Sequence, residues 1–188
     1  MAASRCVLAV ATIFIVLGAI PVRASDPAAN FLVRLFSEVC VPNMGQPDKV
    51  RDWANQKRLP SVSNLTALQV FVGKGDKGEA WFVPSKIGNF ALSIRGTTEG
   101  CAVWAREANP AESEALFRKI VEGVKRPGLE VAILDEKKVP TSVGEARSLV
   151  YGIRPAAGQS GFAFTLLTSE KPGSVFQASM QVARASLK

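Results

Sequence analysis

Residues 174–183, Ser-Val-Phe-Gln-Ala-Ser-Met-Gln-Val-Ala, carry the pattern that decides the fold class. Phe176, Ala178, Met180 and Val182 alternate with glutamine and serine, and the side chains of a β-strand point to opposite faces with this same period of two. We therefore expect one face of the strand to be buried and the other to face water. This is typical of an antiparallel sheet and not of a parallel sheet that is covered on both faces.

Seven further segments have the length of strands and are rich in β-branched and aromatic residues. They are residues 68–72, 79–83, 90–95, 101–106, 129–134, 146–153 and 161–168. The first four are separated by turns that contain glycine, and they fit a meander. The sequence therefore predicts a sheet of about eight strands.

Three amphipathic segments predict helices. The first begins at Asp26, a capping residue followed by proline, and ends by Pro42; the second lies within residues 46–60. The third begins at Asn109, which forms a capping box with Glu112, and ends at residues 126–128. The order of elements predicts a single α+β domain over residues 25–188, with the helices packed on one face of an antiparallel sheet.

Residues 1–24 are predicted to be a secretory signal peptide that is cleaved after Ala24. Arg5 precedes an apolar stretch over residues 6–20, and a proline and small residues lead to the predicted cleavage site. The alternative is an uncleaved anchor, but this stretch is shorter than the roughly 20 residues that a helix needs to cross a bilayer. Charged residues interrupt every later apolar run, so we expect no transmembrane segment after cleavage and a periplasmic location.

Two cysteines, Cys40 and Cys101, remain after cleavage, and in an oxidising compartment they are candidates for a disulfide. Cys101 has the same strand parity as Val103 and Ala105 and is expected to point inward. The bond would tie the end of the first helix to a central strand, and closing this loop would stabilise the fold by roughly 4 kcal/mol. The alternative is two buried free thiols.

The net charge argues against a nucleic-acid partner. Residues 25–188 carry a net charge of +5, because two of the 23 Lys and Arg precede Ser25 and none of the 16 Asp and Glu do. The basic residues never form a run longer than two, which is typical of an ordinary solvated surface. Weak attraction to an anionic envelope polymer is the alternative.

The chain contains no histidine, which excludes serine–histidine and cysteine–histidine hydrolases and histidine-ligated zinc sites. Residues 73–78 match the glycine pattern of a phosphate-binding loop, but they lead into a predicted strand where that chemistry requires a helix. The sequence therefore predicts no catalytic, cofactor-binding or metal-binding residues.

Paired carboxylates are the remaining catalytic option, and the candidates are Asp135 with Glu136 and Glu112 with Glu114. The first pair lies beside two lysines at a strand end, which is typical of a solvated turn. The second pair lies in the first turn of a helix, where carboxylates favour the positive end of the helix dipole. Structural roles are the favoured interpretation for both pairs.

Of the three tryptophans, Trp104 is the one that strand parity places opposite Cys101. Burial in the core is the favoured interpretation of all three. The alternative is that Trp104 shares an exposed sheet face with Arg95 and Arg106, which would form a tentative binding surface.

The first half of the mature chain resembles an uncharacterised family of small exported proteins and lipoproteins of proteobacteria, the NMCC-type family, named only after a meningococcal locus. The similar segments are residues 36–40, Trp53 with residues 59–60, and residues 78–81, 88–92 and 100–103. The resemblance implies a periplasmic location and supports the pairing of the two cysteines, but it implies no activity. The lipobox of the lipoproteins is missing here, which favours a freely diffusing form.

Two functions are consistent with these observations. The favoured hypothesis is a non-catalytic binding or accessory module of the bacterial envelope, whose partner is another envelope protein or an anionic polymer. The alternative is a histidine-free hydrolase that uses carboxylates on an envelope substrate. An enzyme should have acidic residues clustered in a deep pocket, whereas a binding module should have a shallow apolar or basic patch on one sheet face.

Overall fold

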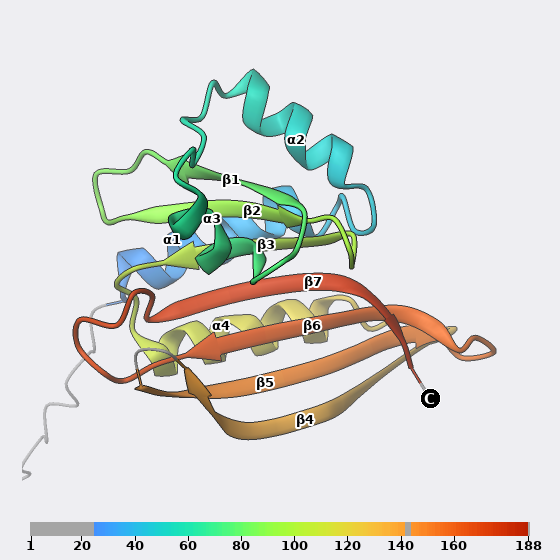
Figure 1. Cartoon of the computed structure of the whole chain (residues 1–188). Coiled ribbons are helices and arrows are strands. Elements are labelled where there is room, and N and C mark those ends of the chain that lie inside the picture. The colour runs from blue at the N-terminus through green and yellow to red at the C-terminus, as the bar shows by residue number, and fades with distance from the viewer. Residues whose placement is uncertain (1–24, 142–143, 188) are drawn as a thin grey trace, which may run out of the picture.

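The computed structural model describes residues 25–141 and 144–187, and it confirms the α+β class (Figure 1). Seven strands form one antiparallel sheet in the order β1-β2-β3-β7-β6-β5-β4. The strands are β1 (Gly78–Val83), β2 (Phe90–Arg95), β3 (Gly100–Ala105), β4 (Leu129–Thr141), β5 (Gly144–Pro155), β6 (Ser160–Thr168) and β7 (Ala178–Ser186). The predicted signal peptide lies outside the described residues.

The sheet consists of two meanders, β1–β2–β3 and β4–β5–β6–β7, which join where β3 pairs with β7. The segment with the clearest alternation therefore lies at the centre of the sheet. Its strand begins at Ala178, four residues later than the pattern suggested, because Ser174 and its neighbours form a loop. In that loop the Ser174 hydroxyl donates to the carbonyl of Phe176.

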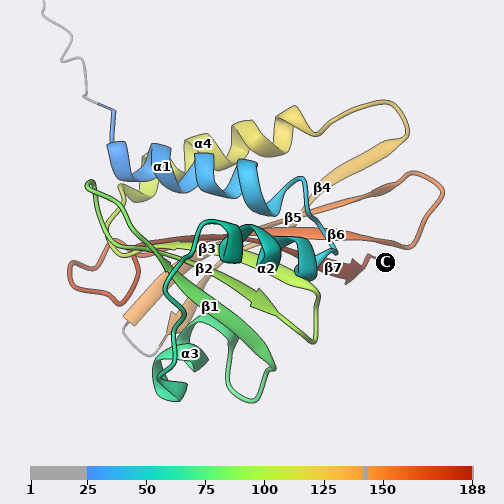
Figure 2. The ribbon, with the colours of Figure 1, turned by 90° about the horizontal axis from the view of Figure 1, so that it is seen from above.

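One face of the sheet is covered by α1 (Pro27–Leu35), its π-helical continuation η1 (Phe36–Cys40), α2 (Pro47–Gln56) and α4 (Pro110–Gly123) (Figure 2). The Asp26 side chain caps α1 by accepting a hydrogen bond from the backbone N–H of Ala28 at 2.9 Å, as its sequence position predicted. Phe36 is fully buried against Phe164, with the ring centroids 6.0 Å apart. All three predicted helices therefore contribute to this main core.

The fourth helix, α3 (Leu65–Val72), corrects the sequence prediction, which assigned a strand to residues 68–72. The Asn64 side chain accepts a hydrogen bond from the N–H of Ala67 at 3.0 Å and caps the helix. Phe71 and Val72 are buried against the sheet face opposite the other helices, in a second and smaller core (Figure 2). The sheet therefore has seven strands instead of about eight, and helices cover both of its faces.

The predicted disulfide is present between Cys40 and Cys101, whose Cα atoms are 5.4 Å apart. It joins the end of η1 to β3. Cys101 points to the main core with Val103, as the strand parity predicted. Both cysteines are buried, so the bond lies within the packed interface between helix and sheet.

Candidate functional site

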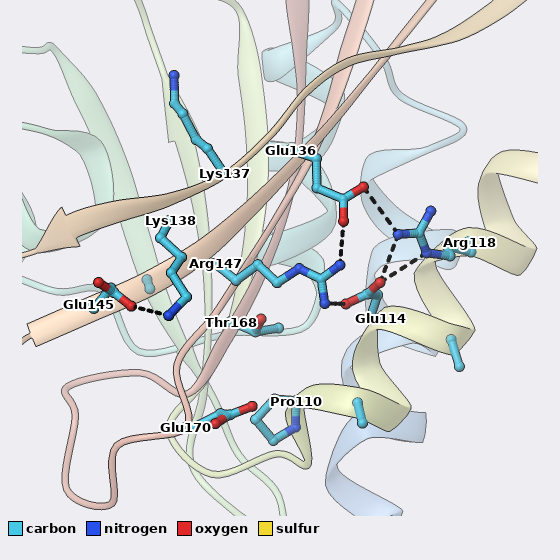
Figure 3. Close-up of a pocket in the computed structure, with 13 residues that line it drawn as sticks. Pro110, Glu114, Arg118, Glu136, Lys137, Lys138, Glu145, Arg147, Thr168 and Glu170 are labelled. Atoms are coloured by element: carbon cyan, nitrogen blue, oxygen red, sulfur yellow. Dashed lines mark hydrogen bonds and ion pairs between the residues drawn. The ribbon is translucent and has the colours of Figure 1, made fainter.

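A cavity of about 870 Å³ lies between α4 and the strands β4 and β5, and we call it the charged cleft (Figure 3). Its lining includes as many carboxylates as cationic groups. These residues are Glu114, Glu136, Glu145 and Glu170, with Arg118, Lys137, Lys138 and Arg147. Because an enzyme of this kind should have acidic residues clustered in a pocket, this cleft is where a carboxylate-dependent active site would be expected.

Four side chains of the charged cleft form a closed network of ion pairs (Figure 3). Arg147 on β5 binds Glu114 on α4 at 2.8 Å and also binds Glu136 on β4. Arg118 binds the same two carboxylates, at 2.8 Å and 3.6 Å, and donates a hydrogen bond to the hydroxyl of Tyr151 at 2.6 Å. The network therefore links α4 to β4 and β5 through ion pairs.

The electrostatics of this network do not suit acid–base catalysis. A general acid at neutral pH needs a carboxyl group whose pKa is raised by burial or by a neighbouring negative charge. Here the hydrogen bond from Arg147 lowers the pKa of Glu136, and the hydrogen bond to Glu114 raises the pKa of Arg118. The bond from Arg147 therefore favours the ionised form of Glu136, which is the opposite of what a general acid needs.

The other carboxylates that the sequence suggested for catalysis also have structural partners. Glu112 accepts hydrogen bonds from the backbone N–H of Asp26 at 2.8 Å and from the Ser25 hydroxyl at 2.9 Å, and the bond from Asp26 contributes most to lowering its pKa. Asp135 forms an ion pair with Lys137 at 2.7 Å. Among the described residues, no cluster of three potential ligand side chains could hold a metal ion.

A second cavity, about 620 Å³, lies where β1 ends, β2 begins and the loop before β7 passes, and we call it the Phe82 groove. It is lined by residues 82–85, 88–91, 106 and 173–176. Phe82 is 49% exposed and Val175 is 43% exposed, although both are large apolar side chains. Arg106 is the one charged residue in this lining.

The Phe82 groove rests on a cluster of aromatic rings beneath α3. The Phe71 ring contacts the rings of Phe82, Trp104 and Phe176, with centroid distances of 6.3, 5.8 and 5.1 Å. The indole N–H of Trp104 donates to the Ser93 hydroxyl at 2.9 Å, so its polar group is satisfied inside the cluster. These contacts give the groove a packed floor.

Arg95, Trp104 and Arg106, the tentative binding surface, do not lie together in one cavity of the structure. Trp104 is only 8% exposed because α3 covers it, in agreement with the favoured interpretation of core burial. Arg95 pairs with Gly100 at the start of β3, whereas Arg106 follows the end of that strand. Only Arg106 belongs to the Phe82 groove.

Phe82 and Val175 were not predicted to lie at the surface. A usable signal was the neighbouring pair Trp81-Phe82, because adjacent residues on a strand point to opposite faces and one of the two rings must leave the main core. Trp81 is buried in that core, and Phe82 lies on the other face. The incorrect strand at residues 68–72 concealed the helix that borders this face.

None of the helices within residues 25–141 and 144–187 has the length and apolar character needed to span a bilayer. The resemblance to the exported family noted above stays a prediction. In comparisons with protein-family models, curated proteins and solved structures, no match to this chain was found.

Proposed function

We propose that this chain is an exported, non-catalytic binding or accessory module of the bacterial envelope, and that the Phe82 groove holds its partner. In this proposal the signal peptide is removed after Ala24 and the mature protein resides in the periplasm. The buried Cys40–Cys101 disulfide supports export, since such bonds persist in oxidising compartments. The groove supports a binding role, since large exposed apolar side chains around a cavity are typical of interaction sites.

The observation that carries the proposal is the exposure of two large apolar side chains in the lining of the groove. Phe82 and Val175 line it, and Ile87 lies in the turn that follows β1. Leu65 and Val70 are exposed on α3, the helix that packs beside β1. A lone exposed apolar residue requires no explanation, but two that line one cavity favour a partner with an apolar contact surface.

The alternative, a carboxylate-dependent hydrolase, receives less support from the geometry. The carboxylates at the centre of the charged cleft are bound by arginines, and the hydrogen bond from Arg147 lowers the pKa of Glu136. Hydrolysis of an envelope substrate that is lost in a Glu136→Gln variant would favour this alternative over the binding module.

Photo-crosslinking in intact cells tests the binding role. A benzophenone amino acid is placed at position 82 and, as the matched control, at position 133, because Ile133 is 51% exposed on the distant edge strand β4. We expect a discrete crosslinked species from position 82 and none from position 133. Identical products from the two positions, or no product from position 82, would contradict the assignment of the groove.

The proposed location is tested separately, by fractionating the cells and sequencing the N-terminus of the recovered protein. The expected result is a periplasmic protein that begins at Ser25. Recovery of the protein from the cytoplasm with Met1 intact would contradict export, whatever the crosslinking result.

A further inference from the structure

A third cavity, about 490 Å³, lies at the opposite end of β7 from the Phe82 groove, and we call it the arginine cleft. It is bordered by the loop after η1, the turn after α4 and the ends of β5, β6 and β7. Its lining contains the guanidinium groups of Arg126, Arg154 and Arg184 and no carboxylate. The complete lining consists of Met44, Arg126, Leu129, residues 153–155, residues 160–162 and residues 184–186. The charged cleft, by contrast, has equal numbers of both charges.

The floor of the arginine cleft is apolar and continuous with the main core. Met44, Leu129 and Phe162 are partly buried and pack against that core, and Ile153 belongs to it. The guanidinium carbon of Arg184 lies 5.8 Å from the centroid of the Phe162 ring. A cationic group is thereby positioned directly above an apolar surface.

The three arginines differ in how far their charge is already neutralised. Arg154 is held by an ion pair with Glu130 at 2.9 Å and by a hydrogen bond to the carbonyl of Leu187 at 3.1 Å. Arg184 bonds Glu99 through its Nε atom. Arg126 is exposed and has no ion-pair partner among the residues that the structure describes. Arg126 and the Nη donors of Arg184 are therefore the groups open to a ligand.

We propose that the arginine cleft binds an amphiphile in which a phosphate group is attached to an alkyl chain. The phosphate would accept hydrogen bonds from Arg126 and Arg184, since the guanidinium fork matches phosphate oxygens and several donors on separate segments suit a group with several acceptors. The chain would lie on the floor of Met44, Leu129 and Phe162. The volume lies within the range of cavities that hold small ligands.

Binding of dodecyl phosphate below its micelle concentration, followed by calorimetry, tests this site. Arg126→Gln should weaken binding about fivefold, the amount expected for one partly exposed charge-assisted hydrogen bond. Glu99→Gln should strengthen binding, because Arg184 is then released from its carboxylate. A purely structural Arg184–Glu99 pair would not produce this gain.

The matched control is Arg34→Gln, which removes an exposed arginine that stacks on Phe31 outside the cleft. We expect this variant and Phe82→Ser to bind dodecyl phosphate as the wild type does, so the result is independent of the Phe82 groove. Equal losses in the Arg34 and Arg126 variants, or no gain in the Glu99 variant, would overturn the proposal.

Two further ligands test the two parts of the amphiphile. Inorganic phosphate and dodecanol should each bind at least tenfold more weakly than dodecyl phosphate, and comparable binding of either would overturn the proposal. Vesicles of phosphatidylglycerol, compared with phosphatidylcholine, identify the source of the phosphate. Binding to the anionic vesicles that is weakened by Arg126→Gln assigns the site to a membrane lipid, whereas binding to dodecyl phosphate alone assigns it to a free amphiphile.

Discussion

Reduction of the Cys40–Cys101 disulfide is expected to cost this protein a large part of its stability. The two cysteines are 61 positions apart in the sequence. In the chain-entropy model, closing a loop of this length removes about 4 kcal/mol of unfolded-state entropy at 25 °C, against a typical net stability of about 5–15 kcal/mol for a whole domain. Reduction removes no side-chain heavy atom, although the two sulfur atoms must separate to van der Waals distance, so we expect the loop term to be the larger part of the loss.

Urea denaturation followed by tryptophan fluorescence measures this difference, since the chain has three tryptophans. We expect the free energy of unfolding to fall by about 4 kcal/mol when dithiothreitol reduces the wild type. A Cys40→Ala, Cys101→Ala double variant should be at least as unstable and should not respond to dithiothreitol, which makes it the control for nonspecific effects of the reductant. A loss below about 1 kcal/mol, with both thiols shown by alkylation to be free, would refute the loop argument.

Three further perturbations test the packing and the charges. The pKa of Glu136 is lower in the folded chain than in the unfolded chain, so its stabilising effect is complete above the unfolded pKa and is lost as the pH falls through the folded pKa. Glu136→Gln should therefore flatten the dependence of the urea midpoint on pH between pH 5 and pH 3. An unchanged slope would contradict the role of the bond to Arg147. Trp104→Phe should cost about 1 kcal/mol in urea denaturation, because the Ser93 hydroxyl loses its indole donor, and a variant as stable as the wild type would show that this bond contributes little. Phe36→Ala should cost about 3–5 kcal/mol by creating a cavity in the main core, measured as the shift in the urea midpoint, and a cost below about 1 kcal/mol would mean that the site collapses around the smaller side chain.

The alternation of apolar and polar residues was sufficient to predict most of the sheet. It works for β7 because Ala178, Met180 and Val182 pack into the main core, whereas the alternate positions carry polar or small side chains. It failed at residues 68–72, where a short apolar run fits a strand as well as a helix. The capping side chain of Asn64 favoured the helix over the strand, but a cap stabilises a helix by only about 1 kcal/mol.

The sites were harder to predict than the fold, because their residues meet only through tertiary structure. Glu114 and Arg147 face each other across the charged cleft from a helix and a strand that are far apart in sequence. Arg126 and Arg184 likewise line one cleft, although Arg126 precedes β4 and Arg184 lies in β7, at the other end of the second meander in the sequence. No spacing rule connects such pairs, whereas the disulfide could be predicted because residues 25–188 contain only two cysteines.

The hydrogen bonds from Ser25 and Asp26 to Glu112 have a consequence for maturation. If the leader peptidase cuts before Ser25, a neutral peptide N–H becomes an ammonium group beside a carboxylate that already accepts bonds from both residues. The trimmed chain would then gain an ion pair between its new start and the first turn of α4, which the untrimmed precursor lacks. Under the proposed cleavage, processing would thereby strengthen the attachment of α1 to α4.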